Sequence, residues 1–274
     1  MQEENPTDPL LLQVMPNRDE FNEVPGFSHD PLIENDAAST SGMLHKYESR
    51  VLLIFRGGCA VNCRYCFRRH FPYQEHHLTQ QKWATIEAYI IAHSEVNEVI
   101  LSGGDPLMAS DAHVIKAAQK LAKLPQIKRL RIHSRLPIVI PDRLTRALAE
   151  QLQATKLQII LVVHANHPRE ISSALKTKLQ IWQQHGITLL NQSVLLAGVN
   201  DDAEVLAELS EELFAAGILP YYLHQLDKVA GAAHFQVEDK KALAIQAQLL
   251  KMLPGFLVPK LVREIGGEAS KTPL

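Results

Sequence analysis

The chain has only three cysteines among its 274 residues, and all three lie within eight positions, at Cys59, Cys63 and Cys66. A disulfide framework needs paired cysteines spread along the chain, so this sequence is not a disulfide-stabilised scaffold. No apolar run approaches the roughly 20 residues that a membrane-spanning helix requires. The first 21 residues contain acids and prolines where a signal peptide has basic and apolar segments. We therefore expect a cytoplasmic protein that crosses no membrane.

An excess of charge of one sign is also lacking. The chain has 28 Lys and Arg against 30 Asp and Glu, which gives a formal net charge of −2. So weak a charge provides no general attraction to nucleic acid or to a membrane surface, and we expect neither among the partners. Hydrophobic residues make up 46% of the sequence, which is enough for a sizeable core.

Regular secondary structure is expected mainly after residue 45. Residues 1–45 are rich in Pro, Asn, Asp and Ser, which predicts an extended arm with a short helix at Asp8–Met15. Beyond the arm, short apolar runs alternate with longer amphipathic stretches. The predicted strands are Val51–Phe55, Glu98–Leu101, Arg129–Ile132, Gln158–Val163, Thr188–Val194 and Ile218–Leu223. The predicted helices follow them at residues 80–93, 111–123, 142–153, 170–185, 202–216 and 238–252.

Six alternating strand–helix units predict an α/β protein with a parallel sheet, either an open partial barrel or a doubly wound sheet. In both architectures, ligands bind at the loops that follow the carboxyl ends of the strands. Polar stretches stand at these places, namely the cysteine loop, "SGGDPL", "HSRLP" and "HANHP". This coincidence favours an enzyme. We expect His164 and His167 to make hydrogen bonds in the wall of its site.

The cysteine spacing, Cys-x3-Cys-x2-Cys, indicates a metal site with one position left open. Structural zinc takes four ligands, and His70 could be the fourth. Ferredoxin-type clusters normally take four thiolates, so a four-iron cluster on three thiolates leaves one iron free to bind a small ligand. Buried cysteines that act as small hydrophobic residues are the remaining alternative. The neighbouring Gly57 and Gly58 allow a tight turn, which favours the open cluster.

This spacing, with the aromatic Tyr65 directly before the last cysteine, resembles the signature of the radical S-adenosylmethionine (radical SAM) superfamily. The resemblance implies a partial (β/α)6 barrel, similar to a TIM barrel, and a [4Fe–4S] cluster on Cys59, Cys63 and Cys66 whose open iron binds SAM. It further implies that Tyr65 lies near the adenine. The segment implied to bind the methionyl group of SAM comprises Ser102, Gly103, Gly104 and Asp105. An ordinary strand–helix turn is the alternative for that segment.

From about His45 to Leu274 the chain is similar to the lysine 2,3-aminomutases, a branch of radical SAM enzymes that depends on pyridoxal 5′-phosphate (PLP). The matching stretches include "HKYESRVLL", "CRYCFRRHF", "RIHSRLPIVIP", "NQSVLLAGVND", "PYYLHQLDKVAGAAHF" and "REIGGEASKTP". Within the branch, "GGCAVNCRYCFRRHFPY" and "LVPKLVREIGGEASKTPL" most resemble the enzymes that supply β-lysine for modification of translation elongation factor P. A lysine beside a glycine-rich loop is able to hold PLP, although a lysine so near a terminus is usually a solvated residue.

The resemblance implies a role for each residue of the site. Lys271 would hold PLP, and Arg50 would lie near its phosphate, in a stretch that also contains Lys46 and Tyr47. Arg68 would bind the substrate carboxylate, and Gln192 would contact the adenosyl group. Asp227 and Glu264 would bind the ε-ammonium of lysine. These charges suit their ligands, because a guanidinium pairs with a carboxylate and a distal ammonium needs compensating acids. Alternatively, the cations are surface residues and Asp227 caps a turn.

The resemblance predicts an isomerase that converts (S)-α-lysine to (R)-β-lysine with a [4Fe–4S] cluster, SAM and PLP. Its partners would be L-lysine, an external one-electron reductant, and elongation factor P with its lysine ligase pathway. The alternatives are an aminomutase for another amino acid, such as glutamate, and a non-catalytic cysteine–metal protein. The predicted domains are an arm (1–45), the partial barrel (46–255) and a C-terminal segment with the PLP lysine (256–274).

Overall fold

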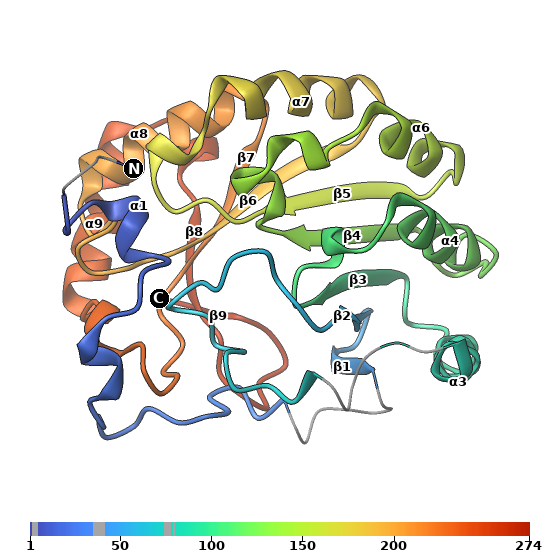
Figure 1. Cartoon of the computed structure of the whole chain (residues 1–274), viewed down its shortest axis with the longest axis horizontal. Helices are drawn as coiled ribbons and strands as arrows, with labels where there is room; N and C mark the ends of the chain where they lie inside the picture. Colours follow the sequence, from blue (N-terminus) through green and yellow to red (C-terminus); the bar gives the residue numbers. More distant parts are fainter. Residues whose placement is uncertain (2–4, 35–41, 74–77, 79) are drawn as a thin grey trace.

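The computed structural model describes residues 1, 5–34, 42–73, 78 and 80–274 (Figure 1). In this part of the chain nine strands form one sheet whose spatial order follows the sequence, from β1 to β9. Strands β2 to β8 are parallel, while β1 and β9 pair antiparallel with their neighbours. The predicted α/β partial barrel is therefore confirmed.

Each predicted strand is present, within two residues at its ends. The strands are β1 Met43–Tyr47, β2 Arg50–Arg56, β3 Glu98–Gly103, β4 Arg129–Ser134, β5 Gln158–Val163, β6 Thr188–Val194, β7 Leu219–His224, β8 Lys260–Arg263 and β9 Thr272–Pro273. The longer helices are α3 Gln80–Ala92, α4 Asp111–Leu121, α6 Arg146–Ala154, α7 Ser173–Gln184, α8 Ala203–Ala215 and α9 Asp239–Met252. The short helices are α1 Pro9–Leu12 and α5 Leu136–Val139. Figure 1 shows the longer helices arranged along the outside of the curved sheet.

Three strands were not predicted, and each is short or polar. Strands β1, β8 and β9 extend the sheet beyond the six predicted strands at its two ends. The sheet therefore runs across residues 45 and 256, and the proposed division into arm, barrel and C-terminal segment stays a prediction. The expected helix at Asp8–Met15 is one turn, α1, which Asp8 caps by accepting from the Leu10 N–H at 2.8 Å. Residues 35–41 of the arm lie outside the described residues.

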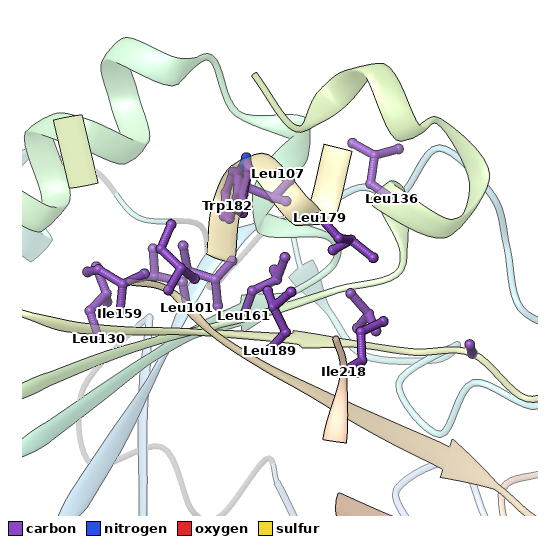
Figure 2. Close-up of a cluster of buried hydrophobic side chains, with 14 of the residues drawn as sticks. Leu101, Leu107, Leu130, Leu136, Ile159, Leu161, Leu179, Trp182, Leu189 and Ile218 are labelled. Atoms are coloured by element: carbon purple, nitrogen blue, oxygen red, sulfur yellow. The ribbon is translucent and has the colours of Figure 1, made fainter. Parts of the chain in front are cut away.

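The strands separate an outer apolar face from an inner polar one. In β4, Leu130 and Ile132 are fully buried, whereas Arg131 and His133 alternate with them and line a cavity. Successive side chains of a strand point to opposite faces, so this alternation gives the sheet two surfaces. Figure 2 shows the outer cluster, in which Trp182 of α7 packs with leucines and isoleucines from the strands. Fully burying such an aliphatic side chain contributes about 1.5–3 kcal/mol.

The inner face is consequently free to carry polar chemistry, while the outer core holds the strands in place. Among the described residues, no helix combines the length and apolar character needed to cross a membrane.

Candidate active site

Two adjoining cavities lie against the inner face of the sheet. One, of about 1080 Å³, is lined by the three cysteines, and the other, of about 840 Å³, is lined by Lys271. The residues that line both are Phe67, Arg68, Ser102, His133, His164, Gln192 and Glu264. Since they share these walls, the cavities form one continuous site that reaches from the cysteine loop to the C-terminal lysine.

The cysteine loop follows β2. Cys59 is exposed, Cys63 and Cys66 are partly buried, and all three are free thiols that line the larger cavity. His70 does not join them, because its Nε2 lies 3.2 Å from the carbonyl of Ala230 and its ring stacks on His29. Within the described residues, no set of three or more His, Cys, Asp and Glu side chains is placed to hold a single metal ion. The geometry therefore does not support the Cys3His zinc alternative.

Two basic residues of this loop form ion pairs with the N-terminal arm. Arg64 and Arg69 both form ion pairs with Glu20, the latter at 2.7 Å between Nη2 and Oε2. Their charges hold the pKa of Glu20 down at about 2 although burial acts in the opposite direction. Arg64 and Arg69 thus tie the arm to the cysteine loop.

The glycines after β3 touch the backbone of the cysteine loop. The Gly104 N–H donates to the Arg56 carbonyl at 2.7 Å, and the Asp105 N–H donates to the Gly58 carbonyl at 3.0 Å. A Cβ on Gly104 would lie 2.6 Å from the Gly58 oxygen, and Gly103 has a φ of +107°. Only glycine fits such contacts, so "SGGDP" fixes the cysteine loop at the cavity wall.

The predicted cofactor residue Asp105 has its carboxylate fully engaged. Oδ1 accepts from the Leu107 N–H at 3.0 Å and from the Ser134 hydroxyl at 2.7 Å. Oδ2 accepts from the backbone N–H groups of Arg135 and Leu136, both at 2.9 Å. Burial raises the pKa of this carboxyl group, and the four donors oppose that shift. Asp105 therefore joins the loops after β3 and β4, both of which line the larger cavity.

Tyr65 is also held by the protein. Its hydroxyl accepts from the Asn166 amide at 2.7 Å and from the Arg135 guanidinium. Arg135 in turn pairs with Glu170 at 2.8 Å. The Tyr65 ring packs edge-on against Phe235, with 6.3 Å between ring centroids. Tyr65 is buried yet lines the larger cavity, as expected for a residue beside the adenine.

Five cations line the smaller cavity, namely Lys46, Arg50, Arg68, Arg131 and Lys271. The Arg50 guanidinium lies 4.2 Å from the centroid of the Tyr47 ring. Arg131 Nε is buried and has no hydrogen-bond partner among the described residues. An unused buried donor suits a phosphate group, so Arg131, with Arg50 in the same cavity, fits the phosphate of PLP. Arg131 was not predicted as a site residue.

Two carboxylates stand near Lys271. Its ammonium forms an ion pair with Glu264, which also lies 3.5 Å from Lys46 Nζ and accepts from the Tyr47 hydroxyl at 3.3 Å. Burial alone would raise the pKa of Glu264, but Lys271 and Lys46 lower it to about 2. Asp227 lines the larger cavity, where burial and the Glu264 charge raise its pKa to about 7. The predicted pair of acids is thus at one cavity wall.

Three histidines complete this wall. His133, His164 and His224 line the larger cavity, and the Nε2 atom of each is buried without a hydrogen-bond partner among the described residues. Burial lowers the pKa of His164 to about 4 and, together with the Lys271 charge, that of His224 to about 3. Buried polar atoms normally have partners, so neutral rings with unused nitrogens fit a site that binds ligands. His167, in contrast, caps a 3-10 turn by accepting from the Arg169 N–H at 3.2 Å.

Arg68 lies between the two cavities and lines both. Its guanidinium is buried, donates to the Ser102 hydroxyl at 3.3 Å, and pairs with Glu34 of the arm. Gln192, from β6, also lines both cavities. The structure thus brings all the residues to which the resemblance assigns a role, and the expected His164, to the walls of one continuous site, and it adds Glu34, Arg131, His133 and His224.

Comparisons with known proteins define the class. The sequence profile described as the Radical SAM superfamily matches residues 53–209. A radical SAM methyltransferase from Sphaerobacter thermophilus has a similar fold, with a TM-score of 0.55 and 16% identity over 81% of this chain and 68% of that one. Streptococcus suis SuiB bound to S-adenosylmethionine gives a TM-score of 0.53 and 14% identity over 85% of this chain and 54% of that one. The chain belongs to the radical SAM superfamily, as the cysteine spacing and the partial barrel predict.

More similar relatives narrow the family. The L-lysine 2,3-aminomutase of Escherichia coli K12 is 56% identical over 274 residues, which cover 100% of this chain and 80% of that protein. The L-lysine 2,3-aminomutase of Haemophilus influenzae is 53% identical over 98% of this chain and 79% of that protein. That of Clostridium subterminale is 35% identical over 98% of this chain and 65% of that protein. Within the superfamily, this chain is a member of the lysine 2,3-aminomutase family.

Proposed function

We propose that this enzyme converts (S)-α-lysine to (R)-β-lysine, with a [4Fe–4S] cluster, SAM and PLP as its cofactors. The observation that supports this most strongly is the single continuous site, which has three free thiols at one end and a lysine with two acids at the other. When bound, the cofactors supply a hydrogen-abstracting 5′-deoxyadenosyl radical and an aldehyde that takes up the migrating amine.

At the cluster end, Cys59, Cys63 and Cys66 would hold the iron. The Gly103–Gly104 backbone packs on the cysteine loop, and Asp105 fixes that segment to the loop after β4. The two rigid loops would orient SAM, with Tyr65 and Gln192 beside its adenosyl group. The physical purpose of this rigidity is to keep a reactive radical close to one hydrogen of the substrate.

At the PLP end, Lys271 would bind the aldehyde carbon while Arg50, with Arg131, binds the phosphate. In the free protein, the Lys271 ammonium is the ion-pair partner of Glu264. With Nζ bonded to the cofactor, Lys271 would no longer be the ammonium partner of Glu264, whose carboxylate would then be available to another cation. The ε-ammonium of the incoming lysine is that cation, and Asp227 lies in the same cavity to share it.

The charges of the site favour lysine over glutamate. Arg68 would bind the α-carboxylate, and Asp227 and Glu264 would bind the distal ammonium. A distal carboxylate would instead face two acids in a partly buried site, where repulsion between like charges is strong. Three neutral histidines add no positive charge that could compensate it.

The test is side-by-side turnover of L-lysine and L-glutamate by the anaerobically reconstituted enzyme, with dithionite as the one-electron reductant. We expect β-amino acid from lysine and at least about 100-fold less from glutamate, as the loss of a charged contact plus repulsion implies. Equal rates on the two substrates would contradict the assignment of Asp227 and Glu264.

We further infer that the β-lysine supplies modification of translation elongation factor P. The support is the resemblance of the cysteine loop and of the C-terminal stretch to that branch of the family. The test is the intact mass of elongation factor P isolated with its lysine ligase from cells with and without this chain. The modified mass should depend on this chain, and on Lys271 within it; an unchanged mass would refute the link.

A further inference from the structure

Glu34, in the arm, makes the most enclosed ion pair of the site. Its side chain is 3% exposed, and it pairs with Arg68 through two contacts, Nε to Oε2 at 2.6 Å and Nη2 to Oε1 at 2.8 Å. Oε1 also lies 2.9 Å from Lys46 Nζ. The Glu34 backbone is fixed as well, because its N–H donates to Asp30 Oδ1 at 2.9 Å. Glu34 is therefore a rigid carboxylate built into the wall of the cavity that Lys271 lines.

The stereochemistry of the guanidinium decides what this pair leaves free. Arg has five N–H groups in one plane. Glu34 occupies the edge formed by Nε and Nη2, and the Ser102 hydroxyl takes one N–H of Nη1. One N–H on each of Nη1 and Nη2 remains. These two donors, on neighbouring nitrogens of one charged group, remain available to a carboxylate.

Arg68, which carries the two free donors, lines both cavities. Ser102 lines both cavities and receives its hydrogen bond from Nη1, so Nη1 lies on the cavity side of the guanidinium. Glu34 lines the smaller cavity and a small neighbouring recess but not the larger cavity, so its carboxylate lies away from the larger cavity. The pair also offsets the repulsion between Arg68 and Lys46, both of which Glu34 contacts.

We propose that Glu34 is a positioning residue for the substrate carboxylate. It holds one edge of Arg68 so that the other edge is presented, already oriented, to the α-carboxylate of the amino acid. This inference rests on the proposed function, in which Arg68 binds that carboxylate. Glu34 would thereby set the preference of the enzyme for a substrate with a free α-carboxylate. If Glu34 were instead a substitute for the substrate carboxylate that must be displaced, its removal would tighten substrate binding.

The test compares L-lysine with L-lysine amide, which has the same two amines but no carboxylate. The enzyme is reconstituted with cluster and PLP but without SAM, and each ligand is titrated by the change in the visible absorption of PLP. For Glu34→Gln we expect the Kd for L-lysine to rise about 10- to 100-fold, as for loss of a charged hydrogen bond. The Kd for the amide should change less than about threefold, and Glu34→Asp should recover part of the preference. In turnover assays, KM should rise more than kcat falls.

Glu20→Gln is the matched control, because it also removes an acid by which the arm pairs with arginines but does not touch Arg68. It should leave the ratio of the two Kd values as in the unchanged protein. If Glu34→Gln bound both ligands equally more weakly, Glu34 would only anchor the arm. If Glu34→Gln bound lysine more tightly, Glu34 would be a substitute for the substrate carboxylate that lysine must displace. Either result overturns the proposal. Thermal unfolding of each variant verifies that it is folded, and if Glu34→Gln is not, Glu34→Asp carries the same comparison.

Failure of the proposed function would look different from failure of this inference. If the unchanged protein gave no absorption change with L-lysine, the lysine assignment itself would be wrong. If it bound lysine and Glu34→Gln bound it with the same selectivity, only the role of Glu34 would be rejected.

Discussion

The ammonium of Lys271 is the ion-pair partner of the carboxylate of Glu264. Both side chains are 17% exposed, both belong to the C-terminal segment, and both line the smaller cavity. A lysine side chain is thus already bound by the acid that the proposed function assigns to a lysine substrate. In the free protein, this ion pair resembles the contact that the ε-ammonium of the substrate would make with Glu264.

Substitution of Lys271 separates its charge from its chemistry. Lys271→Ala should abolish PLP attachment and β-lysine formation. It should also lower the free energy of unfolding by about 1–3 kcal/mol, because among the described residues it leaves Glu264 with Lys46 as its one ion-pair partner. Lys271→Arg should also abolish PLP attachment. Its free energy of unfolding should lie within about 0.5 kcal/mol of that of the unchanged protein, because the ion pair with Glu264 is kept. Borohydride reduction followed by mass analysis measures the attachment, and urea unfolding of the cofactor-free chain measures stability. PLP attached to Lys271→Ala at full stoichiometry would contradict the assignment.

Substitution of the thiols tests the cluster site. Cys59→Ser, Cys63→Ser and Cys66→Ser should each reduce bound iron and sulfide after anaerobic reconstitution by at least about tenfold, because a cluster on three ligands has none to spare. His70→Ala should retain the iron, since its ring contacts His29 and Ala230. Loss of metal from His70→Ala, or recovery of one zinc and no sulfide from the unchanged protein, would instead support a zinc site.

Two glycines in contact provide a matched pair. Gly104→Ala would place a Cβ 2.6 Å from the Gly58 oxygen, whereas a Cβ on Gly58 would meet nothing within 4 Å. We expect Gly104→Ala to displace the cysteine loop, with loss of most bound iron and about 1–3 kcal/mol of stability. Gly58→Ala should retain both. Iron and sulfide analysis with urea unfolding decides between them, and equal behaviour of the two variants would contradict the close contact.

The acid Asp227 should make stability depend on pH. Its pKa is raised from 3.8 to about 7 by burial and by Glu264. Between these values the folded state keeps a proton that the unfolded state has lost, so the free energy of unfolding falls as pH rises through this range. Asp227→Asn removes the cost of ionising this carboxyl group in the folded state. The difference in free energy of unfolding between the variant and the unchanged protein should therefore be more favourable to the variant at about pH 8 than at about pH 4, by about 1–3 kcal/mol.

The control for this pH effect is Asp142→Asn, which makes the same change of net charge at a side chain that is 87% exposed. Urea unfolding across the pH range measures both variants without cofactors. A stability difference for Asp227→Asn that is independent of pH would show that this carboxyl group is not desolvated in the cavity.

The fold was largely predictable because the central strands are apolar runs. Strand β5, Gln158–Val163, has the predicted bounds, because a continuous apolar run is typical of a strand whose sheet is covered on both faces. Strand β8 was missed because four residues, two of them basic, give no usable periodicity. Strand β9 is a two-residue pairing that only the folded chain defines.

Site residues were predictable where a single sequence motif identifies them. They were not predictable where the fold brings distant segments of the chain together. The cysteine loop and Lys271 each stand in a recognisable stretch. No local pattern links Glu34 to Arg68, because that pair joins the arm to the cysteine loop across 34 residues. His224 left no periodic signal, because burial in β7 does not alternate. His133 did leave one, since it and Arg131 alternate with the buried Leu130 and Ile132 of β4. Polar residues on that alternating face point to the inside of the barrel.

The most direct test of the central claim is the product of the fully reconstituted enzyme. The chain is loaded anaerobically with iron, sulfide and PLP, supplied with SAM and dithionite, and given L-lysine, and the products are separated by chiral chromatography. The account predicts (R)-β-lysine, formed only when all the components are present. A protein that holds its cluster and PLP, cleaves SAM, and yet returns the lysine unchanged would contradict it.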